Sequence, residues 1–204
     1  MKILILVANP IEVAPFDLAY TDPVRGDLVE VKYTGIGKLN AFEKTLEAIS
    51  FRNYDVVLNV GTCGSSVNPI GTILLPDRVV QGDAFVEDGF DKYEYHFCGC
   101  HKPTCSLLTA DVFTVGVERE GFIELPENKR EFDLFDMEAY AIARAADIKG
   151  YLPKTRFIKI VSDNLDSSVY DWEDRAKELA GILCPFVENY IASEYIPGYH
   201  VTVA

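Results

Sequence analysis

The sequence has few basic residues and no long apolar run, and each shortage argues against a class of protein. Its 204 residues include 19 Lys and Arg against 32 Asp and Glu, which gives a net charge of −13. A protein this negative repels a phosphate backbone, so the composition disfavours nucleic-acid binding. No apolar stretch reaches the length that crosses a bilayer, so we expect no membrane association.

Cysteine content and the first apolar run predict the compartment. Five cysteines is an odd number, and free thiols suit a reducing cytosol. The apolar run at residues 3–8 is short and lacks a small-residue cleavage site, so we expect no signal peptide. Since 49% of the residues are hydrophobic, the chain has enough apolar surface for a packed core. We therefore predict a soluble, acidic, cytoplasmic protein with one domain spanning residues 1–204.

Short apolar runs that end in Gly, Asn or Asp recur along the chain and predict strands. The runs at residues 3–8, 55–60 and 157–161 are β-branched, as is typical of interior strands. Two further strands are expected at residues 28–33, which alternate and are more exposed, and at 72–80. Strands that alternate with helices predict a layered α/β domain, in which ligands bind beyond the carboxyl ends of the strands.

Helical spacing of apolar residues occurs in three stretches. They span residues 38–50, 134–147 and about 171–190, with Asp171 as the expected N-cap of the third. The first has acidic and basic residues opposite an apolar stripe, which consists of Leu39, Phe42, Leu46 and Ile49.

Three carboxylates lie at the predicted ends of strands or on an apolar helix face. Glu12 follows the first run, Asp163 follows the run at 157–161, and Glu138 has apolar neighbours three and four residues away. Each has a structural explanation: a first-turn helix acid for Glu12, a turn or cap for Asp163, and an acid paired with a backbone amide or Arg for Glu138. The functional alternative is that Glu138 binds the hydroxyls of a ligand such as a sugar and Asp163 donates a proton.

Two other segments are candidates for binding. The small residues Gly-Thr-Cys-Gly-Ser-Ser at 61–66 form a turn whose amides can approach a flat or anionic ligand, although no Walker Gly-Lys-Ser/Thr follows. Trp172 stands shortly after Asp163, where a lid would be, and packing is the alternative role.

A segment rich in Cys and His is a candidate zinc site. Its Cys-x-Cys spacing is tighter than the usual gap of two to four residues in zinc motifs, and the sequence has no second pair of cysteines to complete a site. The alternative is that these thiols bind no metal. The four candidate ligands are His96, Cys98, Cys100 and Cys105.

Six motifs, in order, resemble those of the nucleoside phosphorylase/nucleosidase superfamily across nearly the whole chain, and most resemble the methylthioadenosine/S-adenosylhomocysteine nucleosidases. The most specific are Asp-Met-Glu-Ala at 136–139 and Ile-Val-Ser-Asp at 160–163. The others are residues 1–13, Gly-Ile-Gly-Lys at 35–38, Asn-Val-Gly-Thr-Cys-Gly at 59–64 and Thr-Ala-Asp-Val-Phe at 109–113. The resemblance implies a three-layer α/β/α sandwich with a mixed, twisted central sheet, assembled as a homo-oligomer, most simply a dimer.

The resemblance also implies a role for each matching residue. Glu12 would activate the attacking water, Glu138 would accept hydrogen bonds from the 2′ and 3′ hydroxyls, and Asp163 would protonate purine N7. Ser162 would position Asp163. The remaining substrate contacts would come from Thr62, Cys63, Gly64, Phe113 and Met137. From its place in the sequence alone, Trp172 is added as a candidate binding residue.

Water is the acceptor that this sequence favours. Related phosphorylases hold phosphate with arginines, one of them where this chain has Asn59, and the tetrad at 22–25 lies too far after the first strand to replace them. We predict a purine, adenosine-type nucleosidase that needs neither a cofactor nor a metal and binds a small nucleoside. The alternatives are a phosphate-dependent phosphorylase, an inactive nucleoside-binding relative and a zinc-dependent sensor.

Overall fold

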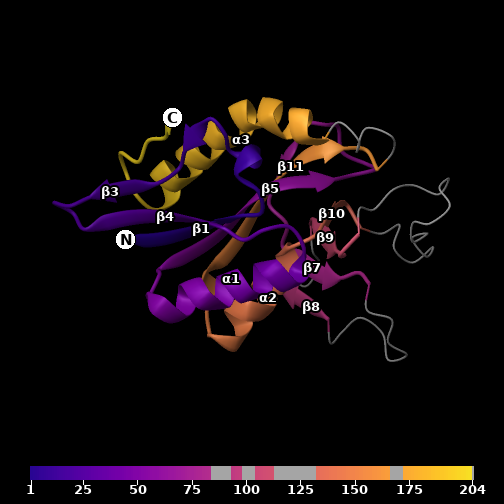
Figure 1. Ribbon diagram of the computed structural model, residues 1–204, viewed down its shortest axis with the longest axis horizontal. Coiled ribbons are helices and arrows are strands. Elements are labelled where there is room, and N and C mark those ends of the chain that lie inside the picture. The colour runs from indigo at the N-terminus through magenta and orange to yellow at the C-terminus, as the bar shows by residue number, and fades with distance from the viewer. Residues whose placement is uncertain (84–92, 98–103, 113–131, 166–171, 204) are drawn as a thin grey trace.

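Apolar side chains alternate between the two faces of the central strands, and helices cover both faces. On β1 (Lys2–Val7), Ile3, Ile5 and Val7 pack in a core cluster with α3 (Trp172–Glu194). The intervening leucines pack in a second cluster with α1 (Lys38–Phe51) and α2 (Ala139–Ile148). Figure 1 shows α3 on one side of the sheet and α1 with α2 on the other. The computed structural model, which describes residues 1–83, 93–97, 104–112, 132–165 and 172–203, thus confirms the predicted α/β/α sandwich.

The central sheet is mixed, as predicted. Parallel pairing joins β4 to β1, β1 to β5, β5 to β11, β10 to β9 and β9 to β7. Antiparallel pairing adds β3 to β4, β8 to β7, β6 to β11 and β10 to β5, and β2 pairs with β12 in a separate small sheet. The elements besides those above are η1 (Pro10–Glu12), β2 (Phe16–Asp17), β3 (Tyr20–Asp22), β4 (Asp27–Tyr33), β5 (Val56–Gly64), β6 (Ile73–Leu74), β7 (Arg78–Gln81), β8 (Glu94–His96), β9 (Ser106–Thr109), β10 (Leu134–Asp136), η4 (Leu152–Lys154), β11 (Thr155–Asp163) and β12 (Thr202–Val203).

Four of the five predicted strands are present, and the fifth is wrong. Residues 72–80 form two short strands, β6 and β7, which pair with different neighbours. Pro76 lies between them and has no N–H for a sheet hydrogen bond, which explains the interruption. β5 also runs further than predicted, through Gly64, because β11 pairs with it along its length.

Two helix predictions need correction. Residues 134–136 form strand β10 beside β9, and the helix predicted over 134–147 begins only at Ala139. A short apolar run fits either a buried strand or a helix, and here the neighbouring strand decides. On α1 the expected stripe is displaced: Leu39 is 78% exposed, and the buried face consists of Ala41, Thr45, Ala48 and Ile49. Asp171 lies outside the described residues, and no described helix is long and apolar enough to cross a membrane.

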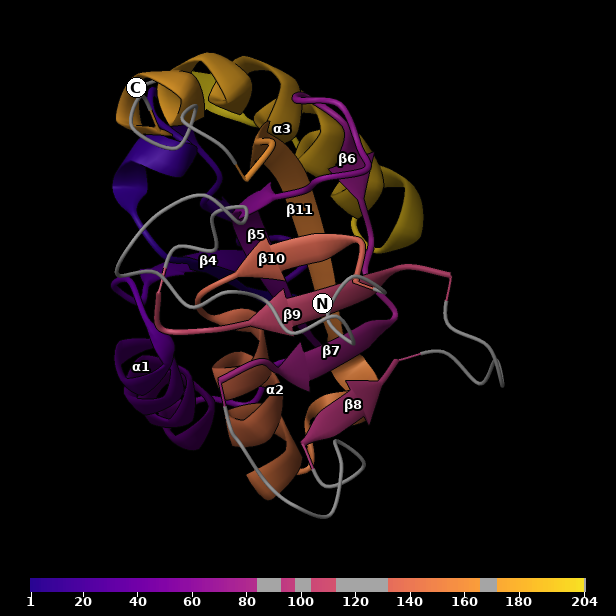
Figure 2. The ribbon, with the colours of Figure 1, turned by 90° about the vertical axis from the view of Figure 1, so that its right-hand side faces the viewer.

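The sheet brings the ends of several strands together at one edge. Because β1, β5 and β11 are parallel, their carboxyl ends lie on the same side of the sheet. β10 meets this edge from the opposite direction and pairs Phe135 with Gly64. Figure 2 shows α3 above the strands and α1 with α2 below them. The predicted acids at 12, 138 and 163 all follow or end strands of this group.

Candidate functional site

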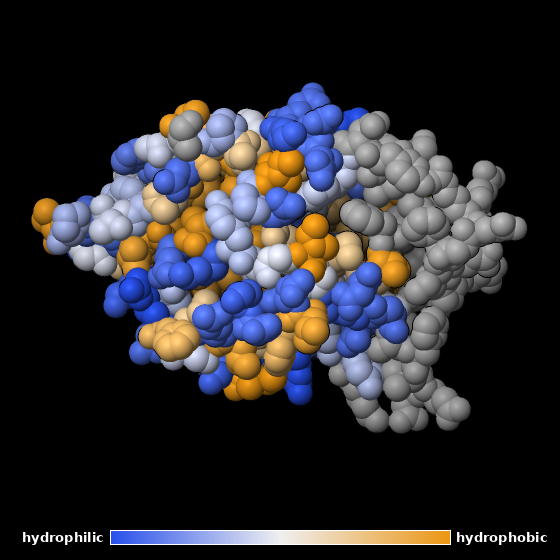
Figure 3. Space-filling view, in the orientation of Figure 1, coloured by the Kyte–Doolittle hydropathy of each residue, from blue (hydrophilic) through white to orange (hydrophobic). Residues whose placement is uncertain are grey.

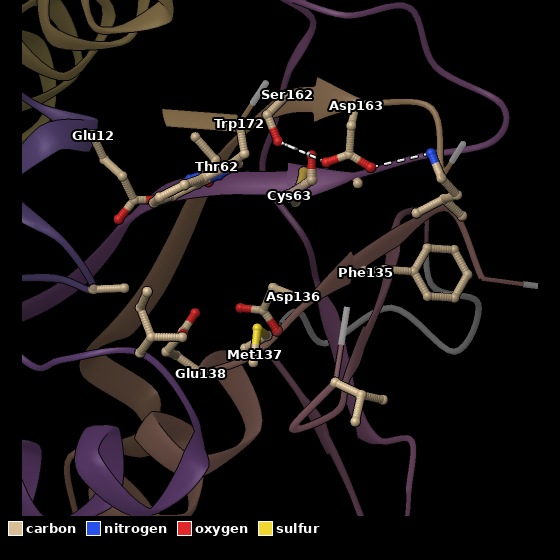
Figure 4. A pocket seen from close by; sticks show the side chains of 15 residues that line it. Glu12, Thr62, Cys63, Phe135, Asp136, Met137, Glu138, Ser162, Asp163 and Trp172 are labelled. Carbon is tan, nitrogen blue, oxygen red and sulfur yellow. Dashed lines mark hydrogen bonds between the residues drawn. The ribbon is translucent and has the colours of Figure 1, made fainter. Parts of the chain in front are cut away.

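A pocket opens where these strand ends meet, and four carboxylates line it. The space is about 550 Å³, including the part that opens to solvent. Figure 4 shows Glu12, Thr62 and Asp163 on one side and Asp136 and Glu138 on the other. No Lys, Arg or His is among the described residues that line this pocket. The lining residues are Ala8, Glu12, Ile36, Thr62, Cys63, Gly64, Val112, Phe135, Asp136, Met137, Glu138, Ser162, Asp163, Leu165 and Trp172.

Glu12 is held in the wall of this pocket by three hydrogen bonds. It ends η1, and its Oε2 accepts the Asn9 N–H at 3.1 Å in a capping box. Its Oε1 accepts both the backbone N–H and the hydroxyl of Thr62, each at 2.7 Å. A Cβ on Gly61 would lie 2.9 Å from the same Oε1, so only glycine permits this approach. The predicted first-turn position of Glu12 is correct, and the side chain also reaches β5.

Asp163 and Ser162 are consecutive, yet both side chains line the pocket. Successive residues of a strand normally point to opposite faces, but the register of β11 against β5 shifts between Val161 and Asp163. The Ser162 hydroxyl lies 2.9 Å from Asp163 Oδ2 and 3.2 Å from the Cys63 carbonyl, and the Leu165 N–H donates to Oδ1 at 3.1 Å. The carboxylate is therefore aimed into the pocket from a fixed bulge.

Glu138 faces these residues from the start of α2. It occupies the N-cap position rather than the apolar helix face that we predicted, because residues 134–136 are a strand. The N–H of Gly37, which has φ +93°, donates to its Oε1 at 2.9 Å. Burial raises the pKa of Glu138 to about 8, and the nearby Asp136 charge adds to this, against the opposing effects of Lys159 and the Gly37 N–H. The predicted backbone-amide partner is thus present.

A buried ion pair, absent from our predictions, lies close to Glu138. Lys159 Nζ and Asp136 Oδ2 are 2.9 Å apart, with side chains 2% and 1% exposed. Asp136 also accepts hydrogen bonds from the Thr109 hydroxyl at 2.7 Å and the Ala139 N–H at 2.9 Å. Burial alone would lower the pKa of Lys159, but the carboxylates of Asp136 and Glu138 outweigh it and the net shift is upward. A lysine within the apolar run 157–161 was the signal for such a pair.

All but one of the other predicted binding residues line the pocket, and the exception, Phe113, is not among the described residues. Those that line it are Thr62, Cys63, Gly64, Met137, Ser162 and Trp172. The Trp172 indole N–H donates to the Thr62 hydroxyl at 3.0 Å. Burial raises the pKa of the Cys63 thiol well above its ordinary value, which argues against a thiolate nucleophile there.

The zinc prediction remains a prediction. Of its four proposed ligands, Cys98 and Cys100 lie outside the described residues. His96 Nε2 lies 3.0 Å from Glu94, while Cys105 is buried. Across the parts of the chain that the structure does describe, no group of three or more His, Cys, Asp or Glu is placed to hold a metal ion.

Several solved structures of other proteins have the same arrangement of helices and strands. Futalosine hydrolase of Helicobacter pylori superposes with a TM-score of 0.74 at 18% identity, over 94% of this chain and 97% of that one. The chain has the fold of this hydrolase. The 5′-methylthioadenosine/S-adenosylhomocysteine nucleosidase of Neisseria meningitidis, in complex with methylthio-immucillin-A, gives 0.75 at 18% identity, over 94% and 99%. The same enzyme from Helicobacter pylori gives 0.74 at 19% identity, over 94% and 98%.

These matches confirm the predicted resemblance to nucleosidases at the level of the fold. No protein-family model and no curated protein sequence matches the chain. The likeness therefore rests on the architecture, and the roles of individual residues rest on the geometry of the pocket.

Proposed function

We propose that this protein hydrolyses the N-glycosidic bond of a purine nucleoside of the adenosine type, releasing the free base and the sugar. The observation that carries the proposal is the convergence of Glu12, Glu138 and Asp163, from three separate segments, on one pocket of a nucleosidase fold. Cleaving this bond produces an oxocarbenium-like sugar and a leaving base that needs a proton. Separate carboxyl groups suit these separate tasks.

Asp163 is proposed as the general acid that protonates the leaving base. It ends a strand, its Oδ1 is fixed by the Leu165 N–H, and its Oδ2 is beside the Ser162 hydroxyl. A serine hydroxyl accepts as well as donates, so it holds the carboxyl group in either protonation state. Asp163 thereby gains a defined direction toward the pocket without losing the ability to release its proton.

Glu12 and Glu138 are proposed to act on the water and the sugar. Glu12 is buried at the opposite end of the pocket wall from Asp163, and a carboxylate there can orient and deprotonate the attacking water. Glu138 accepts one hydrogen bond among the described residues, from Gly37, which leaves its second oxygen for the 2′ and 3′ hydroxyls. Met137, next to it, would pack against the sugar, and Thr62, Cys63 and Gly64 would form the floor.

Water is proposed as the acceptor because the pocket suits an anion poorly. Four carboxylates line it, and its described lining residues include no cationic side chain. Phosphate would need cationic or multiple amide donors to offset its own negative charge, and no described side chain of the lining is cationic. The proposed reaction therefore needs no phosphate.

The experiment that tests the proposal is release of free base from a panel of nucleosides in phosphate-free buffer. We expect the wild-type protein to release purine base and Asp163→Asn to lower kcat by at least about 100-fold while binding changes little. Asp174→Asn is the matched control, because that side chain is 92% exposed on α3. No base release by wild-type protein would refute the function, and a fully active Asp163→Asn would refute the assignment of the acid.

A further inference from the structure

The only tryptophan of the chain is hydrogen-bonded to the pocket wall. Trp172 is the first residue of α3, and its indole N–H donates to Thr62 Oγ1 at 3.0 Å. Thr62 lies on β5, so this bond joins the start of α3 to the central sheet 110 residues earlier in the chain. Figure 4 shows Trp172, Thr62 and Glu12 along the same side of the pocket.

The chemistry of the indole group determines the direction of the bonds that follow. Indole N–H is only a donor, so the Thr62 hydroxyl must accept from it. The single hydroxyl proton of Thr62 is then directed to Glu12 Oε1, 2.7 Å away. Because the Thr62 backbone N–H reaches the same oxygen at 2.7 Å, both Thr62 donors converge on Oε1. A chain of donors therefore runs in one direction, from Trp172 through Thr62 to Glu12.

The surroundings leave the Glu12 carboxylate little freedom to turn. Gly61 approaches Oε1 so closely that a Cβ there would lie 2.9 Å from it, and Oε2 accepts the Asn9 N–H at 3.1 Å. Without the indole N–H, the Thr62 hydroxyl would lose one of the two hydrogen bonds that fix its direction. Since Glu12 is only 3% exposed, solvent offers few replacement donors.

We infer that Trp172 is a positioning residue, which fixes the Glu12 carboxylate through the Thr62 hydroxyl and so supports the activation of water. The inference rests on the proposed function for its last step, and on the hydrogen bonds alone for the others. Stacking of the indole on the substrate, the role expected of a lid, is a different contribution because it needs the ring and not the N–H.

The test replaces the N–H without removing the aromatic surface. Trp172→Phe keeps a ring in place and should lower kcat about tenfold, the effect of one hydrogen bond near the reacting atoms, with KM changed less than twofold. In a Thr62→Val background, which lacks the hydroxyl, Trp172→Phe should have no further effect on kcat. In a Thr62→Ser background, which keeps the hydroxyl, it should again cost about tenfold.

Fluorescence tests the same link without any activity. Trp172 is the only indole, so its emission reports this site alone. We expect Thr62→Val to shift the emission maximum to shorter wavelength, because the excited indole loses its acceptor, and Thr62→Ser to restore it. Equal emission from wild type and Thr62→Val, or equal kcat for wild type and Trp172→Phe, would overturn the inference. An inactive wild type that shows the expected shift would instead refute the proposed function and leave the link from Trp172 to Thr62 intact.

Discussion

Burial controls the behaviour of the Glu138 carboxyl group. Its largest influence is loss of solvent, which raises the pKa to about 8 from the ordinary 4.5. Between these values the folded protein keeps a proton that the unfolded chain releases. The contribution of Glu138 to stability is therefore complete below pH 4.5 and is lost as the pH rises toward 8.

Replacing Glu138 by Gln should remove this pH dependence. The difference in the free energy of unfolding between wild type and Glu138→Gln should change by at most about 1.4 kcal/mol per pH unit between pH 4.5 and 8, to the disadvantage of wild type at high pH. Urea unfolding at several pH values measures it. A difference that does not vary with pH would contradict the raised pKa.

The same substitution tests the sugar contact. Glutamine keeps an oxygen for the Gly37 N–H but binds vicinal hydroxyls less well than a carboxyl group does. We expect Glu138→Gln to lower kcat/KM for ribonucleosides by about tenfold or more and to affect 2′,3′-dideoxy analogues far less. Equal losses for both classes of substrate would mean that Glu138 does not bind the hydroxyls.

Replacing glycine by alanine should have opposite effects on stability at Gly64 and at Gly181, because the space around the added methyl group differs. A Cβ on Gly64 would lie 2.4 Å from Leu165 Cδ2 and 2.8 Å from Asp163 Oδ1, whereas a Cβ on Gly181 of α3 meets nothing within 4 Å. Gly64→Ala should destabilise the protein by about 1–3 kcal/mol and displace Asp163, lowering activity. Gly181→Ala should stabilise it by about 0.5–1 kcal/mol with activity unchanged. Thermal unfolding and base release, measured on both variants, check this pair.

At the scale of the elements, the Asp136–Lys159 pair connects β10, β11 and α2 at the pocket wall. Asp136 ends β10, Lys159 lies within β11, and the bond from the Ala139 N–H to Asp136 holds the start of α2. Glu138 lies between Asp136 and α2, so its backbone is fixed on both sides. This link, rather than the sequence of the helix, places the proposed sugar-binding carboxyl group.

Removal of the cation should therefore be costly. Lys159→Met leaves the Asp136 carboxylate buried without its cationic partner and should destabilise the protein by about 3–5 kcal/mol. Lys177→Met, on the exposed side of α3, is the matched control and should change stability by less than about 0.5 kcal/mol. Urea denaturation gives both values. Similar small losses for the two variants would show that the buried pair contributes no net stabilisation.

At the scale of the whole molecule, the chain carries a net negative charge, and apolar residues are scattered over the face that Figure 3 shows. The net charge is −13, and Figure 3 shows hydrophilic residues over much of the visible face with small hydrophobic areas between them. Scattered apolar side chains of this kind are ordinary for a protein surface and do not identify a partner. Assembly as a homo-oligomer and a cytoplasmic location therefore stay predictions.

The charge also bears on the choice of acceptor. Both the overall field and the pocket disfavour an anionic co-substrate, so phosphate should not accelerate the reaction when compared with chloride at equal ionic strength. The expected product is the free sugar. Formation of sugar 1-phosphate would establish the phosphorylase alternative in place of hydrolysis.

Local patterns in the sequence were enough to predict the layers and most of the central strands. The β-branched runs now seen as β1, β5 and β11 have the composition of strands buried on both faces, and each precedes or contains a predicted pocket residue. Glu12 and Asp163 follow from this, because parallel strands bring their carboxyl ends to one edge.

Other features depend on contacts between residues far apart in the chain, which no local pattern encodes. Pairing with β9 makes residues 134–136 a strand, and so moves Glu138 from a helix face to a helix start. Lys159 forms an ion pair because β10 brings Asp136 to 2.9 Å from it. Trp172 reaches the pocket wall because α3 begins beside Thr62. Burial and hydrogen-bond direction at these positions are consequences of packing, which is why they emerge only from the folded chain.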